Sequence, residues 1–258
     1  MVVDRAACLE SLLDKNYDGI IDSRCIDSVL NYVRNNESVA GEDTLFIKKL
    51  TKVCSHILNS EVVLDNSDLE KLFSFNMIGF KKTKKDCSYI SKFSKVIMAS
   101  HFLSYAGDTA EVLFKRTRDL KWAKRFYACN KVSADIVRDF DERHAAYSYG
   151  HAGGAARILF VKTKNAMWCE RWFDCDKLSG EMSINFDKRH STYRYRYAGD
   201  AAKTLFEVTG EEEFRIEAID YYTIFLDYYR RNFDLEMEDL VSRIKGRVSE
   251  LINYKSIG

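Results

Sequence analysis

Three stretches of the chain share one pattern of small and apolar residues: SYAGDTAEVLFKRT (104–117), GHAGGAARILFVKT (150–163) and RYAGDAAKTLFEVT (196–209). They align without a gap, and their glycines Gly107, Gly153 and Gly199 recur at intervals of 46 residues. Self-similarity at a fixed period of this length is the sequence signature of a repeat architecture. We therefore expect these stretches to occupy equivalent places in successive structural units.

The same period extends beyond these stretches. Trp122 matches Trp168, Cys129 matches Cys175, and FDERH (140–144) matches FDKRH (186–190). A unit of 46 residues has room for two helices of about 20 residues joined by short turns, and such helix pairs stack into solenoids. The sequence predicts an all-α protein of helix-pair repeats that form an α-solenoid.

Each unit has the expected helix signals. Asp141 and Asp187 are predicted N-caps, because a short acceptor side chain satisfies the free amides that open a helix. The first helix then carries the small residues, which allow close helix packing and justify a glycine that costs ~1 kcal/mol relative to alanine. The second helices are predicted from Trp122 to Phe140, Trp168 to Phe186 and Phe214 to Phe233, with aromatic residues and thiols facing inward.

Composition supports helices and a folded core. The 258 residues are 46% apolar and include no proline, whereas average usage would give about 13. The net charge of +1 provides no global attraction to nucleic acid or anionic lipid. Seven cysteines without a CxxC pair indicate reduced, buried thiols. The first residues contain no signal-peptide core and no run of 18 apolar residues occurs, so we expect a soluble, cytoplasmic protein without a membrane partner.

The third unit, AGDAAKTLFEVTGEEEFRIEAIDYYTIFLDYY, resembles a tetratricopeptide-type repeat. The resemblance covers roughly residues 96–230, although the period is longer than the usual 34 and the terminal proline of that family is missing. It implies a solenoid within a domain of residues 86–258 that binds a protein or peptide. The segment MEDLVSRIKGRVSELINYKSIG is amphipathic and is expected to cap the array.

Solenoids bind ligands on the face lined by the first helix of each unit. Steps of three and four residues select one polar stripe on those helices. A solvated surface is the plain interpretation of such a stripe. Our hypothesis is that a peptide binds there, with tyrosines as contacts, arginines pairing carboxylates or phosphates, and the extra glycines of the middle unit leaving room. The predicted groove comprises His101, Asp108, Glu111, Arg143, Tyr147, Gly150, Gly154, Arg157, Arg189, Tyr193, Arg196, Asp200 and Lys203.

Other interpretations of the repeated residues stay open at this point. His144 and His190 recur in register, which favours capping or interhelical hydrogen bonds over a metal site. Trp122, Trp168 and Trp172 could stack on nucleotide bases, but their register favours the core. The alternative functions are binding of RNA or a nucleotide through the Tyr/Arg face of the second and third units, and an enzyme with a helical fold. No phosphate loop, nucleophile elbow or HExxH helix nominates catalytic residues.

The first 85 residues form a separate predicted module. The segment that begins at Asp14 resembles the calcium loop of an EF-hand, with Gly19 at the sharp turn. The resemblance implies a Ca²⁺ site, weak because position 12 is Cys25 instead of a bidentate carboxylate. The alternative is a structural loop that only turns the chain. The segment 63–69 is interpreted as the counterpart strand and loop of a degenerate pair, and the lysine-rich run 81–85 as the boundary before the solenoid. The predicted Ca²⁺ ligands are Asp14, Asn16, Asp18, the Ile20 carbonyl and Asp22.

Overall fold

The computed structural model describes residues 64–85, 92–231 and 237–254. Within these ranges the helices are α4 (Asn66–Lys85), α5 (Lys92–Thr117), α6 (Leu120–Val137), α7 (Glu142–Thr163), α8 (Ala166–Ser183), α9 (Lys188–Thr209), α10 (Glu212–Arg231) and α11 (Glu238–Ile252). The ranges contain no strand, so the all-α prediction is confirmed. None of these helices combines the length and apolar character that crossing a lipid bilayer would require.

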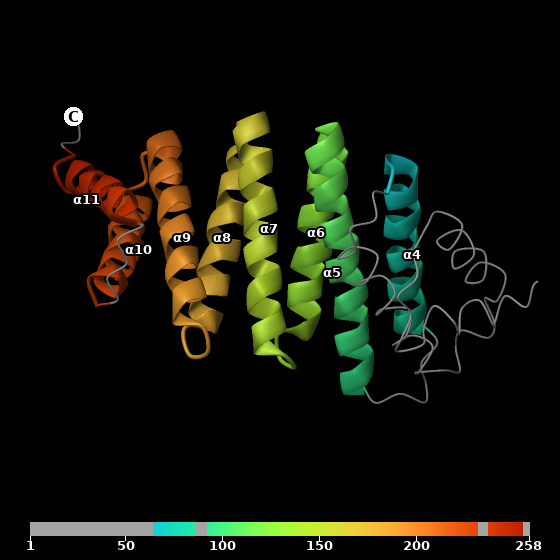
Figure 1. The fold of residues 1–258 in the computed structure, drawn as a ribbon. Coiled ribbons are helices and arrows are strands. Elements are labelled where there is room, and N and C mark those ends of the chain that lie inside the picture. Colours follow the sequence, from blue (N-terminus) through green and yellow to red (C-terminus); the bar gives the residue numbers. More distant parts are fainter. Residues whose placement is uncertain (1–63, 86–91, 232–236, 255–258) are drawn as a thin grey trace, which may run out of the picture. The chain divides into compact units, whose positions relative to one another are not determined.

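The chain divides into two compact units, Met1–Asp141 and Glu142–Gly258. In the first unit α4 packs on α5 and α5 on α6. In the second unit α7 to α11 each pack on the next helix along the chain, and α7 to α10 stand side by side in Figure 1. The three glycine-bearing stretches lie in α5, α7 and α9, each followed by its paired helix. This succession of helix pairs is a helical repeat of the α-solenoid type, as predicted.

The repeated glycines occupy equivalent environments. A Cβ atom on Gly107 would lie 2.2 Å from Nδ2 of Asn130, one on Gly153 would lie 2.8 Å from the Asp176 carboxyl, and one on Gly199 would lie 2.9 Å from the Tyr222 ring. Each of these neighbours lies 23 residues after its glycine, on the paired helix. The glycine is therefore required because the side chain of the second helix crosses the first helix where a Cβ would be.

A buried hydrogen bond also recurs with the period. The Ser133 hydroxyl donates to the carbonyl oxygen of Ser100 at 2.9 Å, and the Ser179 hydroxyl donates to that of Ala146 at 2.6 Å. Donors and acceptors are each 46 residues apart. Because both hydroxyls are fully buried, each bond satisfies a polar group and fixes the second helix against the first.

The turn within each helix pair is the same three times. Arg118, Lys164 and Gly210 adopt left-handed backbone conformations with φ of 58°, 57° and 75°. The preceding threonine hydroxyl donates to the last turn of the helix and accepts from the backbone two residues on. Asp119 and Asn165 then cap α6 and α8. These caps start both helices two residues before the predicted tryptophans, and the helices end three residues before the predicted phenylalanines.

The core contains the repeated aromatic residues and thiols. Trp122, Trp168 and Trp172 are only 2%, 8% and 6% exposed, which confirms the core interpretation over base stacking. The free thiols Cys129, Cys169 and Cys175 are buried. Burial raises the pKa of Cys129 and Cys169 to about 12, so these two thiols stay protonated at neutral pH.

Helix α4 includes most of the segment 63–69 and the whole lysine-rich run. The described part of the segment 63–69 is the start of a helix, in which the Asp65 carboxylate accepts a hydrogen bond from the Asp68 amide at 2.8 Å. The lysine-rich run 81–85 is the end of the same helix, and its Thr83 is buried against the unit. The Ca²⁺ loop with Asp14, Asn16, Asp18, Ile20 and Asp22 lies outside the described residues, and the domain boundary at residue 85 stays a prediction.

The left-handed turn provides a test of the repeat geometry. A side chain in this conformation costs roughly 1–2 kcal/mol, so Lys164→Gly should raise the free energy of unfolding by up to about 1 kcal/mol after the entropy cost of glycine. Lys162→Gly, at an exposed position in the last turn of α7, should lower it by ~1 kcal/mol. Urea unfolding followed by tryptophan fluorescence measures both. An equal decrease in the free energy of unfolding of both variants would contradict the left-handed turn at Lys164.

Candidate functional site

Three residues of the predicted groove lie in the first unit. His101, Asp108 and Glu111 are half-buried on α5. Burial lowers the pKa of His101 and, together with the Glu111 charge, raises the pKa of Asp108 to about 6. Glu111 pairs with Lys115 at 2.7 Å. All three groups lie on this one helix.

The other ten residues lie on two helices of the second unit. Arg143, Tyr147, Gly150, Gly154 and Arg157 are on α7, and Arg189, Tyr193, Arg196, Asp200 and Lys203 are on α9. An open depression of about 410 Å³ lies over the first half of α9, lined by Asp187, Arg189, His190, Tyr193, Arg194 and Tyr197. It contains two predicted residues, Arg189 and Tyr193. We take this depression and its neighbours on α7 as the candidate site.

Tyr147 connects α7 to the first turn of α9. Its hydroxyl donates a hydrogen bond of 2.9 Å to Asp187, and its ring lies edge-on to His190 with centroids 4.6 Å apart. The Asp187 carboxylate also accepts from the His190 backbone amide at 2.9 Å, which confirms the predicted N-cap. These hydrogen bonds stabilise the ionised carboxylate and lower the pKa of Asp187. The rim of the depression is therefore fixed from both helices.

Arg194 ties three helices together. Its guanidinium donates to the Gly150 carbonyl of α7 at 2.9 Å and to the Asp176 carboxylate of α8 at 3.1 Å. Its Nε donates to Nε2 of His190 at 3.3 Å. A Cβ atom on Gly150 would lie 2.5 Å from Cζ of Arg194. The prediction that Gly150 leaves room for a ligand is therefore wrong, because Arg194 occupies that space. The space beside Gly154 is open, since a Cβ atom there would meet nothing within 4 Å.

Burial shifts the ionisation of two groups in this network. Burial raises the pKa of Asp176 to about 6, against the opposing effect of the Arg194 guanidinium. Burial, aided by the Arg194 charge, lowers the pKa of His190 to about 4. Because His190 Nε2 accepts a hydrogen bond from Arg194 Nε, this nitrogen carries no proton and the imidazole is neutral at pH 7. The site thus carries its positive charge on arginines.

Arginines gather around Tyr197 at the end of the depression. The guanidinium carbons of Arg157, Arg194 and Arg196 lie 5.2, 5.8 and 3.9 Å from the Tyr197 ring centroid. Distances within about 6 Å are favourable cation–π contacts. Arg157 comes from α7 and is exposed, whereas the others come from α9 and are half-buried. The sequence stripe included Arg157 and Arg196 but missed Arg194 and Tyr197.

Asp200 is the main carboxylate beside this cluster. It accepts from the Tyr222 hydroxyl at 2.8 Å, from Arg247 of α11, and from Arg196 at 3.4 Å. Arg196 Nε is buried without a hydrogen-bond partner among the described residues. Lys203 pairs with Glu207, and Arg143 lies 5.3 Å over the Phe186 ring. Asp176 could have indicated Arg194 from the sequence. It occupies the same repeat position as Asn130 and Tyr222, and a carboxylate at a core position requires a cation nearby.

A serine and a histidine of this network lie within hydrogen-bonding distance of each other. Ser179 lies 3.1 Å from His190 Nε2, but its buried hydroxyl also donates to the Ala146 carbonyl, as the equivalent Ser133 does to Ser100. The Ser179 hydroxyl therefore has the same structural role as its counterpart in the preceding repeat. In the part of the chain that the structure describes, no three His, Cys, Asp or Glu side chains gather in a metal-binding arrangement. The Nε2 atom of His190 lies 3.1 Å from Ser179 of α8 and 3.3 Å from Arg194 of its own helix.

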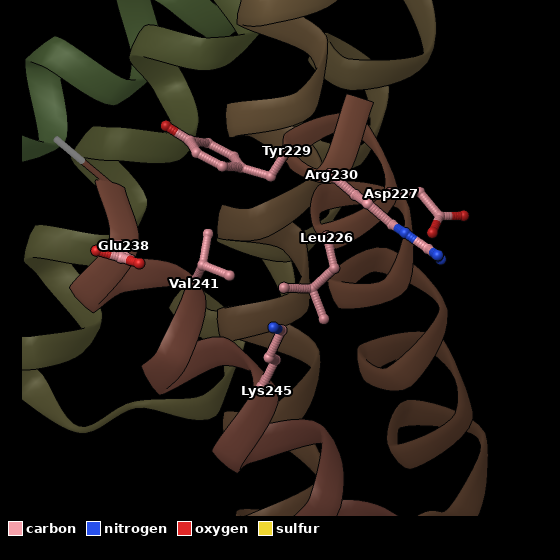
Figure 2. A pocket seen from close by; sticks show the side chains of 7 residues that line it. All are labelled: Leu226, Asp227, Tyr229, Arg230, Glu238, Val241 and Lys245. Carbon is pink, nitrogen blue, oxygen red and sulfur yellow. The ribbon is translucent and has the colours of Figure 1, made fainter. Parts of the chain in front are cut away.

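A second hollow of about 480 Å³ lies between α10 and α11. Figure 2 shows Leu226 of α10 and Val241 and Lys245 of α11 pointing toward the same space. Helix α11 packs on α10, and its Ile244 and Leu251 are buried, while its role as a cap of the array stays a prediction. No residue of the predicted groove lines this hollow, so we assign the candidate site to α9.

Comparisons with known proteins add little to this geometry. No protein-family model matches the chain, and no curated protein matches it. One similar solved structure is a de novo designed helical repeat protein, at 14% identity, 88% coverage of this chain, 96% of that chain and a TM-score of 0.30. Another comes from the computational design of self-assembling cyclic homooligomers, at 9% identity, coverage of 96% and 93%, and a TM-score of 0.25. These scores are too low to support an inference about the site.

Two glycines of α7 provide a matched test of the Arg194 tie. Gly150→Ala should displace Arg194 and leave buried acceptors unsatisfied, lowering the free energy of unfolding by roughly 1–3 kcal/mol. Gly154→Ala should raise it by about 0.5–1 kcal/mol, because alanine is the better helix former and meets no neighbour. Urea unfolding measures both values. A gain in stability for Gly150→Ala would contradict the tie.

The neutral His190 predicts a pH dependence. Its pKa of about 4 lies below the ordinary 6.5, so its stabilising effect is present above pH 6.5 and is lost as the pH falls toward 4. Asp176, with a raised pKa, acts in the opposite direction in this range. His190→Gln keeps the Asp176 effect, so it should lose less stability than the unaltered chain between pH 7 and pH 5. Parallel urea titrations at both pH values test this, and equal losses would contradict it.

Proposed function

We propose that this protein is a non-catalytic interaction scaffold that binds a protein or peptide on the α7–α9 face of its second unit. The observation that carries the proposal is the depression over α9, with arginines and tyrosines held in place from two helices. Tyrosine and arginine are the residues most enriched at energetically important interface positions. Helices that fix these side chains reduce the entropy lost on binding.

The charge of the face selects the class of partner. Arg157, Arg189, Arg194 and Arg196 all lie at or beside the depression. We infer that the bound segment carries anionic groups, because planar guanidiniums pair with carboxylates and phosphates through two parallel hydrogen bonds. The resemblance to tetratricopeptide-type repeats is in keeping with peptide binding on this face and stays part of the proposal.

The function can be tested with a synthetic library of short peptides and the full chain. Acidic peptides should be enriched, and Arg157→Gln with Arg189→Gln should abolish their retention because two cations of the face are lost. The control is Arg125→Gln with Arg171→Gln, which removes the same charge from arginines that lie over Trp122 and Trp168. Retention that survives the first pair of substitutions would refute the proposal.

The alternative function, RNA binding, can be distinguished from peptide binding by the dependence of affinity on salt concentration. Nucleic-acid affinity falls steeply with salt concentration because counterions return to every phosphate that is released. If the chain binds a mixed-sequence RNA oligonucleotide more tightly than any acidic peptide, and this binding collapses between 50 and 200 mM salt, the scaffold proposal would be replaced.

A further inference from the structure

We propose that Arg157, Arg194 and Arg196, gathered around Tyr197, form a recognition site for a phosphomonoester on a peptide or protein side chain. This inference rests on the proposed function and narrows its ligand. The three guanidinium carbons lie 5.2, 5.8 and 3.9 Å from a single ring centroid, so the three cations surround one ring. The adjoining depression provides about 410 Å³ of open space, which is enough for a side chain.

The charges around Tyr197 do not cancel. Arg194 pairs with Asp176, while Arg196 and Arg247 share Asp200, and Arg157 brings a fourth guanidinium. The Glu250 carboxylate also acts on Arg247, so four cations face three carboxylates and leave a surplus of one positive charge. Asp187 and Arg189, which also line the depression, offset each other, and His190 is neutral. A phosphomonoester carries about −1.5 to −2 charges at neutral pH, so this surplus attracts it more strongly than it attracts a single carboxylate.

Hydrogen-bonding capacity supports the same ligand. The Asp200 carboxylate already accepts from Tyr222 and Arg247, and its contact with Arg196 is long at 3.4 Å. Arg196 Nε is a buried donor without a partner in the described ranges. An unsatisfied charged donor of this kind is costly, so an added acceptor is favoured there. Three planar guanidiniums can distribute several donors over the three oxygens of one phosphate group.

The arrangement of the cations distinguishes this site from a nucleic-acid surface. Binding to a nucleic-acid backbone adds contacts to successive phosphates along a track, and its strength grows with the number of phosphates neutralised. Here the cations surround one ring, and the chain as a whole has a net charge of only +1. The geometry suits one doubly charged group instead of a string of singly charged ones.

The test uses the full chain and defined probes in isothermal titration. N-acetyl-phosphotyrosine amide and N-acetyl-phosphoserine amide should bind, whereas their unphosphorylated forms and dimethyl phosphate should not bind at the same concentrations. Arg157→Gln should weaken phosphoamide binding about tenfold, the size expected for one charge-assisted hydrogen bond. Arg157 is exposed, so this variant leaves the fold in place. Arg125→Gln, which removes an arginine from over Trp122, is the control and should bind as the unaltered chain does.

The outcomes separate this inference from the function on which it rests. If acidic peptides bind through the α7–α9 face but the phosphoamides do not, the phosphomonoester site is wrong and the scaffold stands. If dimethyl phosphate or an RNA oligonucleotide binds as well as the phosphoamides, the site reads a phosphodiester and the inference is overturned. Phosphoamide binding that Arg157→Gln leaves unchanged also overturns it. If neither acidic peptides nor phosphoamides bind, both proposals fail.

Discussion

The close approach of two helices at one glycine underlies the geometry of each repeat. At Gly107, Gly153 and Gly199 the paired helix places a side chain where a Cβ atom would be. A glycine inside a helix costs ~1 kcal/mol of stability, so the close contact between the helices must stabilise the fold by at least that amount. Where helices come this close, a serine hydroxyl on one reaches a main-chain carbonyl on the other, as Ser133 and Ser179 do. The recurring turn then fixes the direction in which the chain returns.

The residue that faces the glycine from the paired helix has the same position in each repeat, but its chemical type differs. Its polar group is the amide of Asn130, the carboxylate of Asp176 and the phenol of Tyr222 in successive repeats. An amide can satisfy itself locally, and Asn130 donates to the Phe126 carbonyl of its own helix. A buried carboxylate needs a cation or a proton. Asp176 therefore accounts for the presence of Arg194, and Arg194 in turn accounts for the glycine at position 150.

The 46-residue period predicted the helix pairs and their core. It did not predict contacts that long side chains make with residues outside the repeat register. Equivalent tryptophans, thiols and glycines identified the helix pairs and their core before any coordinates. The sequence did not predict the helix starts at Leu120 and Ala166. The N-caps of these helices follow Arg118 and Lys164, which adopt left-handed conformations that arginine and lysine do not usually signal. Arg194 was missed because its partner Gly150 lies 44 residues earlier, outside the register of the repeat. Long side chains choose partners in three dimensions, and a spacing rule does not describe that choice.

Anchored and exposed arginines contribute differently to the face over α9. Arg194 is held by a carbonyl, a carboxylate and an imidazole, so its rotamer entropy is already lost in the folded chain. Its charge is fixed in place, but its hydrogen bonds are largely committed to the fold. Arg157 is exposed and retains its donors for solvent or a ligand. In the proposed site, the anchored Arg194 attracts an anion toward the depression, and the exposed Arg157 discriminates between anions. Because only the second kind can be replaced without disturbing the helices, Arg157 is the position at which binding and stability can be separated.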